Sequence, residues 1–88
     1  MMDEYKLWDM GFYYRPETKD YVLELWKDFK IRAVIHNKRA KVWIQFRVLE
    51  ELEQCYDMVY LNTFGKTSLQ KLIESYEVAY YLGLEKGK

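Results

Sequence analysis

Gly65-Lys66-Thr67 is the stretch of this sequence that most resembles the end of a phosphate-binding loop. Such a loop needs a second glycine five residues before Gly65, but Tyr60 occupies that position. The sequence Thr67-Ser68-Leu69-Gln70 instead has the pattern of a capping box, in which side chains satisfy the first free N–H groups of a helix. The stretch therefore predicts the start of a helix and no nucleotide site.

His36 is the only histidine and Cys55 the only cysteine, so neither a zinc site nor a Cys–His nucleophilic pair is expected. We expect Cys55 to pack in the core, because free cysteine is among the most buried residue types. A short acidic run could bind a cation, but it also fits the solvated face of a helix; it consists of Glu50, Glu51, Glu53 and Asp57. We therefore predict a protein that is not an enzyme, with no catalytic residue, metal or cofactor.

The net charge of zero conceals an uneven distribution of charge along the chain. Residues 27–47 contain seven cationic side chains and one anionic side chain, a net charge of +6, whereas the segments before and after are each −3 (three cations and six anions in 1–26, four and seven in 48–88). Such a separation indicates either an internally compensated surface or a basic patch that meets an acidic partner.

The basic segment has the pattern of a β-hairpin over Phe29 to Val48. When cross-strand pairs are numbered so that they sum to 77, Ile35 faces Val42, and apolar residues face apolar residues along one side. A slip by one residue would carry cationic side chains into the core, at a cost of several kcal/mol for each unpaired charge. The residues left for the turn are Asn37 to Ala40, a four-residue loop.

The segments before the hairpin extend the same pattern. Pairs that sum to 35 place Tyr14 beside Tyr21, and pairs that sum to 56 place Leu23 beside Ala33. This predicts a four-stranded antiparallel meander with strands at about 8–15, 20–26, 29–36 and 41–48, after a loose segment at residues 1–6. Residues 20–29 also have apolar side chains at helical spacing, so a helix there remains the alternative.

After Arg47 the apolar period changes to that of a helix. We expect helices at about 50–61 and 68–82, with Gly83 ending the second as a C′ residue. The prediction is a single α+β domain over residues 1–88, with both C-terminal helices packed on one face of the sheet in two layers. Its predicted core comprises Phe12, Leu23, Leu25, Ile31, Ile35, Ile44, Phe46, Leu52, Leu72 and Ile73.

The opposite face of the predicted sheet is unusually rich in aromatic and cationic side chains for a solvent face. Exposed apolar patches on small proteins usually mark contacts with other molecules. The expected binding face comprises Tyr13, Val22, Trp26, Val34 and Trp43. The expected basic patch comprises Lys30, Arg32, Lys38, Arg39, Lys41 and Arg47.

Two functions fit this surface. The first is a small protein-binding module, an accessory or inhibitor protein of a phage or mobile element, whose aromatic residues contact another protein or a second copy in a homodimer. The alternative is single-stranded nucleic-acid binding through the basic hairpin 29–48, with aromatic rings stacking on bases. The single cysteine and the absence of an export or membrane-spanning segment lead us to expect a cytoplasmic protein with no membrane partner.

Overall fold

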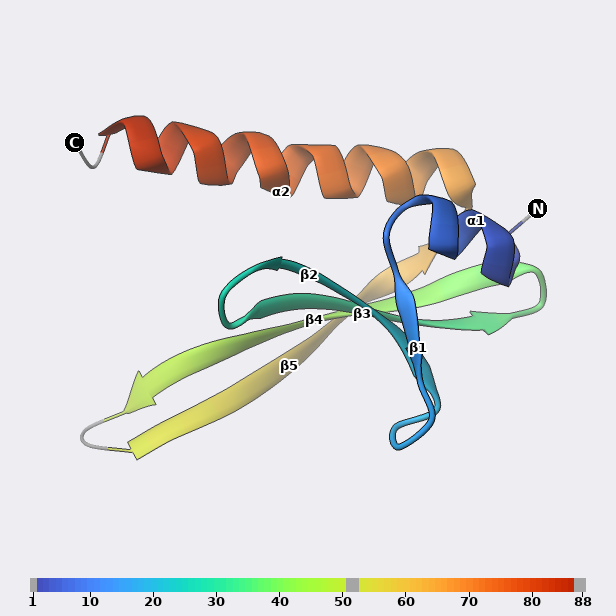
Figure 1. Cartoon of the computed structure of the whole chain (residues 1–88), viewed down its shortest axis with the longest axis horizontal. Coiled ribbons are helices and arrows are strands. Elements are labelled where there is room, and N and C mark those ends of the chain that lie inside the picture. The colour runs from blue at the N-terminus through green and yellow to red at the C-terminus, as the bar shows by residue number, and fades with distance from the viewer. Residues whose placement is uncertain (1, 51–52, 87–88) are drawn as a thin grey trace.

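The computed structural model describes residues 2–50 and 53–86, with side chains except those of residues 48–50, 53–55 and 84–86. A short helix precedes a sheet, and a long helix follows it (Figure 1). In chain order the elements are α1 (Glu4–Asp9), β1 (Tyr13–Arg15), β2 (Asp20–Trp26), β3 (Phe29–His36), β4 (Arg39–Glu50), β5 (Glu53–Phe64) and α2 (Lys66–Lys86).

The strands form one antiparallel five-stranded sheet in the order β1-β2-β3-β4-β5, and α2 lies across one face of it (Figure 1). The core lies on that face, where Leu7 of α1 and Leu69 of α2 join Ile31 and Val42 of the sheet in one buried cluster. The α+β class, the antiparallel meander and the helix on one face are confirmed. The fold differs from the predicted four strands and two C-terminal helices in two ways. A fifth strand stands where the first of those helices was predicted, so one helix follows the sheet, and a short helix that was not predicted precedes it.

The β3–β4 hairpin has a tighter turn than the sequence suggested. Asn37 and Lys38 alone make the loop, with φ of 50° and 61°, and His36 pairs with Arg39. Positive φ at both loop residues is the geometry of a type I′ turn, which matches the twist of the strands. The predicted register was therefore wrong by two residues, since pairs sum to 75 instead of 77, as in Ile31 with Ile44. A shift of two residues leaves every side chain on its predicted face.

Strand β2 settles the alternative between strand and helix in favour of the strand. Its pairing with β1 has the predicted register, with Tyr14 opposite Tyr21. Its pairing with β3 is shifted by two residues from the prediction and contains an irregularity between Glu24 and Trp26. This extra residue changes the alternation, so that Trp26 pairs with Phe29.

The N-terminal segment, predicted as a loose tail followed by a strand from residue 8, begins instead with α1. The Asp3 side chain caps this helix by accepting the Lys6 N–H at 3.0 Å. Gly11, at φ 101°, ends it: its N–H donates to Trp8 O at 2.9 Å, and the Phe12 N–H donates to Leu7 O at 3.0 Å. These are the two hydrogen bonds of a Schellman motif.

Residues 53–64 form β5, so the predicted helix at 50–61 was wrong; its residues 51 and 52 lie outside the described part of the chain. The segment is apolar on both faces, with Tyr56, Met58 and Tyr60 on one and Val59 and Leu61 on the other. A two-sided apolar segment fits both a helical and an extended period, and local sequence does not separate them. The extended form supplies the N–H and C=O groups of β4 with partners along its whole length.

Helix α2 begins two residues before the predicted start and continues through Gly83 to Lys86, so Gly83 does not end it. On its inner face Leu69 and Ile73 are buried, and Tyr76 packs against the core. Farther along, Tyr80 stacks on Trp26 with ring centroids 4.7 Å apart and an interplanar angle of 10°. This aromatic contact attaches the C-terminal half of α2 to the sheet.

Most of the predicted core is confirmed. Of its members, Phe12, Ile31 and Ile73 are buried; those packed against the buried cluster are Leu23, Leu25, Ile35, Ile44 and Leu72. Phe46 is only half-buried, and Leu52 lies outside the described residues. The prediction missed Met2 and Leu7, which are 2% and 0% exposed, because it assigned neither to a regular element. Neither helix in the described part of the chain is long and apolar enough to span a membrane.

Candidate protein-binding face

The sheet face opposite α2 carries a continuous row of side chains across all five strands. Its members, in register from β1 to β5, are Tyr13, Val22, Arg32, Trp43 and Tyr60. The row differs from the predicted one in that Arg32 replaces Val34, which pairs with Lys41 instead. The replacement follows from the two-residue shift in register.

Exposed apolar side chains on this face are concentrated on β5. Tyr56, Met58 and Tyr60 are 59%, 55% and 48% exposed. The Tyr60 ring lies against the Trp43 ring with centroids 5.2 Å apart, and its hydroxyl hydrogen-bonds with Thr63 Oγ1 at 3.0 Å. We call Trp43, Tyr56, Met58 and Tyr60 the aromatic face.

The other residues of the expected binding face have different positions. Tyr13 is exposed at the β1 end of the row, but Val22 is fully buried between Tyr13 and Arg32 in the register. Val34 is half-buried. Trp26 is on the helix side, because the irregularity in β2 turns it toward Tyr80.

Arg32 is the centre of a hydrogen-bonded cluster on the open face. Its guanidinium Nε and Nη2 donate to the two carboxylate oxygens of Asp20 at 2.6 and 3.0 Å. It also donates to Gln45 Oε1 and Thr18 Oγ1, each at 2.7 Å. The side chains of Arg32 and Asp20 are only 13% and 12% exposed. The hydrogen bonds to Asp20 raise the pKa of Arg32, while burial acts in the opposite direction.

This cluster lies in a groove of about 400 Å³. The groove is lined by Thr18, Asp20, Arg32, Gln45, Tyr56, Asp57 and Met58. Polar groups thus line the same groove as the apolar side chains of Tyr56 and Met58. A contact surface with both kinds of group can anchor a partner by apolar burial and orient it by hydrogen bonds.

The remaining cations of the expected basic patch do not gather in one place. Arg47 forms an ion pair with Asp28, with 3.0 Å between Nη1 and Oδ2. Lys38 and Arg39 lie at the β3–β4 turn, where Arg39 donates to the Thr63 carbonyl at 3.3 Å. By register Lys30, Lys41 and Arg47 lie on the open face with the aromatic face, and Arg47 is already paired there with Asp28.

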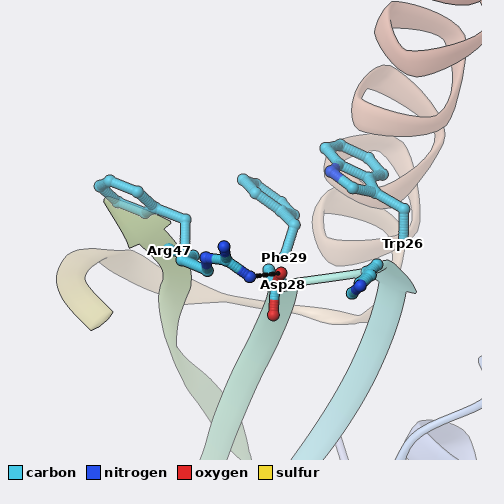
Figure 2. A pocket seen from close by; sticks show the side chains of 6 residues that line it. Trp26, Asp28, Phe29 and Arg47 are labelled. Carbon is cyan, nitrogen blue, oxygen red and sulfur yellow. Dashed lines mark hydrogen bonds and ion pairs between the residues drawn. The ribbon is translucent and has the colours of Figure 1, made fainter. Parts of the chain in front are cut away.

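A second hollow of about 400 Å³ lies at the end of the sheet near the β2–β3 turn, and Figure 2 shows it from close by. The Trp26 and Phe29 rings stack there, 4.4 Å apart at 15°. Asp28 reaches across to Arg47, and the main-chain N–H of Arg47 also donates to the Asp28 carbonyl at 3.1 Å. These contacts join the turn to β4, so we interpret the hollow as structural.

Trp43 and Tyr13 were predicted from the sequence. Tyr56, Met58 and Tyr60 were missed because their segment, which forms β5, was predicted to be a helix. The alternation Gln54, Tyr56, Met58, Tyr60 was the available signal, and the free edge of a sheet ending at β4 was a second.

No group of three or more His, Cys, Asp or Glu side chains in the described residues could hold a metal ion. Comparisons with protein-family models, curated proteins and solved structures found no match to this chain.

Proposed function

We propose that this chain is a small non-enzymatic protein-binding module whose contact surface is the aromatic face of β4 and β5. The observation that carries the proposal is the exposure of Tyr56, Met58 and Tyr60 beside Trp43 on the side of the sheet opposite α2. Aromatic and methionine side chains are enriched in the cores of protein interfaces. An accessory or inhibitor role in a phage or mobile element remains a prediction from the sequence.

The charges favour a protein partner over a nucleic acid. Arg32 is held by Asp20, and Arg47 by Asp28, so two of the six cations of the basic patch are already neutralised within the chain. A partner that approached the face would meet apolar rings and a nearly neutral hydrogen-bonding cluster. Such a surface contributes affinity mainly by burial, with little dependence on salt.

The test is affinity capture from an extract of the cells that make the protein, followed by calorimetry with the purified partner. Trp43→Ala should weaken binding by about 30-fold, the equivalent of about 2 kcal/mol for a central aromatic contact. The matched control is Trp8→Ala, which removes a tryptophan that is 50% exposed on α1. Equal loss of the partner in both variants, or no loss in Trp43→Ala, would contradict the proposal.

A further inference from the structure

Strand β5 is an edge of the sheet, and in the described part of the chain it pairs with β4 alone. It is twelve residues long. An edge strand presents unpaired N–H and C=O groups, which are a template for another strand. Figure 1 shows that the far ends of β4 and β5 extend past the β2–β3 turn, so this edge projects from the body of the molecule.

The pairing pattern shows which groups point outward. The two-residue turn makes His36 and Arg39 a hydrogen-bonded pair, so the N–H and C=O groups of Arg39 point toward β3. Because this direction alternates along a strand, the other odd-numbered residues of β4, including Trp43, also direct their backbone groups toward β3. The residues of β5 opposite them therefore direct theirs away from the sheet; these are Tyr56, Met58 and Tyr60. An independent contact agrees, because the Met58 N–H donates at 3.0 Å to the Asp57 side chain and not to β4.

The side chains of the same segment are also exposed. On the open face Tyr56, Met58 and Tyr60 are about half exposed, and on the helix face Val59 is 43% exposed. Residues 56–60 thus have outward-directed backbone groups at every second position and apolar side chains on both faces. Water can hydrogen-bond to the outward-directed N–H and C=O groups, but it does not cover the apolar side chains. A strand with apolar side chains of its own does both.

We propose that β5 pairs with β5 of a second copy of this chain, antiparallel, about a two-fold axis through Met58. In this register Met58 lies opposite Met58, and Tyr56 lies opposite Tyr60 of the second copy. Each of these pairs joins outward-directed groups, which gives about six N–H···O=C hydrogen bonds and one continuous sheet across both copies.

Neighbouring registers are less favourable. A shift by two residues one way would place Asp57 opposite Asp57 of the second copy, a like-charge pair. A shift by two the other way would pair Tyr56 with Asn62 across the irregularity that β5 shows opposite Val42 and Trp43. A shift by one residue would mix the two faces. The register centred on Met58 avoids all three problems.

The area is sufficient for a reversible dimer. A fully buried aromatic side chain removes about 150–250 Å² from water, so half-exposed side chains at positions 56 and 58–60 retain about 100 Å² each. With the backbone edge included, complete burial of these side chains would remove at most about 1,000 Å² over both copies, the lower bound for a specific interface. The Asp57 carboxylate must leave the Met58 N–H, which also favours weak association.

The experiment is sedimentation equilibrium of the full chain at concentrations up to about 0.5 mM. The wild type should be in monomer–dimer equilibrium. Met58→Lys and Met58→Glu should each weaken self-association more than about tenfold, because like charges then meet at the two-fold axis and apolar contact is lost. An equimolar mixture of the two variants should dimerise, because opposite charges then face each other.

Met58→Pro is a second variant, since it removes an outward N–H that β4 does not use and should also be monomeric. Tyr5→Lys on α1 is the control, and it should dimerise like the wild type because Tyr5 is 65% exposed and is not part of β5. A wild type that is monomeric throughout would overturn the proposal, as would dimers that persist in the Met58 variants or charge variants that fail to associate when mixed.

This pairing shares Tyr56, Met58 and Tyr60 with the aromatic face, but its hydrogen bonds come from the backbone edge of β5, so it can hold where the proposed function fails. Trp43→Ala should leave the dimer intact while it weakens binding to another protein. Failure of the two-fold pairing and failure of the aromatic face as a contact surface are therefore separate results.

Discussion

The Arg32–Asp20 pair is the least exposed of the ion pairs among the described residues. Its two charge-assisted hydrogen bonds form on a sheet face that would otherwise be open to water. Gln45 and Thr18 occupy further donors of the guanidinium. The Arg32 charge is therefore neutralised by Asp20, and the hydrogen bonds to Asp20 and Gln45 join β3 to β2 and β4.

Substitution of Arg32 tests whether this pair stabilises the fold. Arg32→Ala should lower the free energy of unfolding by about 2–4 kcal/mol, because Asp20 would keep a nearly buried carboxylate without its partner. Urea denaturation measures this change through the midpoint. The control is Arg15→Ala, whose exposed contact with Glu17 at 4.0 Å should contribute less than about 0.5 kcal/mol. Equal midpoints for the two variants would show that the pair behaves as an ordinary surface pair.

The local sequence did not reveal this pair because the registers of β3 against both of its neighbours were predicted wrongly. Asn37-Lys38 lacks the glycine that usually marks a type I′ turn, and a longer loop was therefore predicted. In the β2–β3 register predicted from the sequence, Glu24 lies opposite Arg32, whereas in the structure Val22 does. The faces were nevertheless predicted correctly for β3 and β4, because a shift of two residues preserves them.

At the level of whole elements, β2 and β3 have the predicted bounds. By contrast, α1 stands where a loose tail and the start of a strand were predicted, and β5 stands where a helix was predicted. In α1, the alternation of Trp8, Met10 and Phe12 resembled a strand, but Asp3 and Gly11 supply the two caps of a helix. In β5, the deciding interaction is pairing with β4, which no local pattern contains. Capping residues were visible in the sequence; the pairing partner was not.

Substitution of Gly83 tests whether α2 continues past this residue. It lies inside the helix, its φ is not in the positive region, and an added Cβ would meet no atom within 4 Å. Gly83→Ala should therefore raise the free energy of unfolding by up to about 1 kcal/mol, because alanine loses less backbone entropy in a helix. The measurements are the thermal midpoint and the helical signal in circular dichroism. If Gly83 instead ended the helix in a left-handed conformation, the same change would destabilise the protein.

At the scale of the molecule, the charge of the hairpin is partly compensated by carboxylates from neighbouring turns and strands. Asp20 begins β2 and Asp28 lies in the β2–β3 turn, and each binds one arginine of the +6 segment. From the sequence, internal compensation was one of two interpretations of the charge separation; the other was a basic patch that meets an acidic partner. The ion pairs themselves could not be predicted, because the registers of β2 with β3 and of β3 with β4 differ by two residues from the predicted ones.

The nucleic-acid alternative makes a different prediction for the whole molecule. With zero net charge and two arginines engaged, we expect no measurable binding of mixed-sequence single-stranded oligonucleotides at about 50 mM salt. Binding is measured by the quenching of tryptophan fluorescence. Among the described residues Trp43 is the only tryptophan on the open face, since Trp26 stacks between Phe29 and Tyr80. The variant Trp43→Phe therefore identifies the contribution of the open face to the quenching. Quenching that is lost in Trp43→Phe, with log affinity falling against log salt at about −0.7 per phosphate contacted, would contradict this expectation. Loss of the same binding in Lys30→Ala and Lys41→Ala would then locate the phosphates on the open face, and nucleic-acid binding would replace protein binding as the function of the aromatic face.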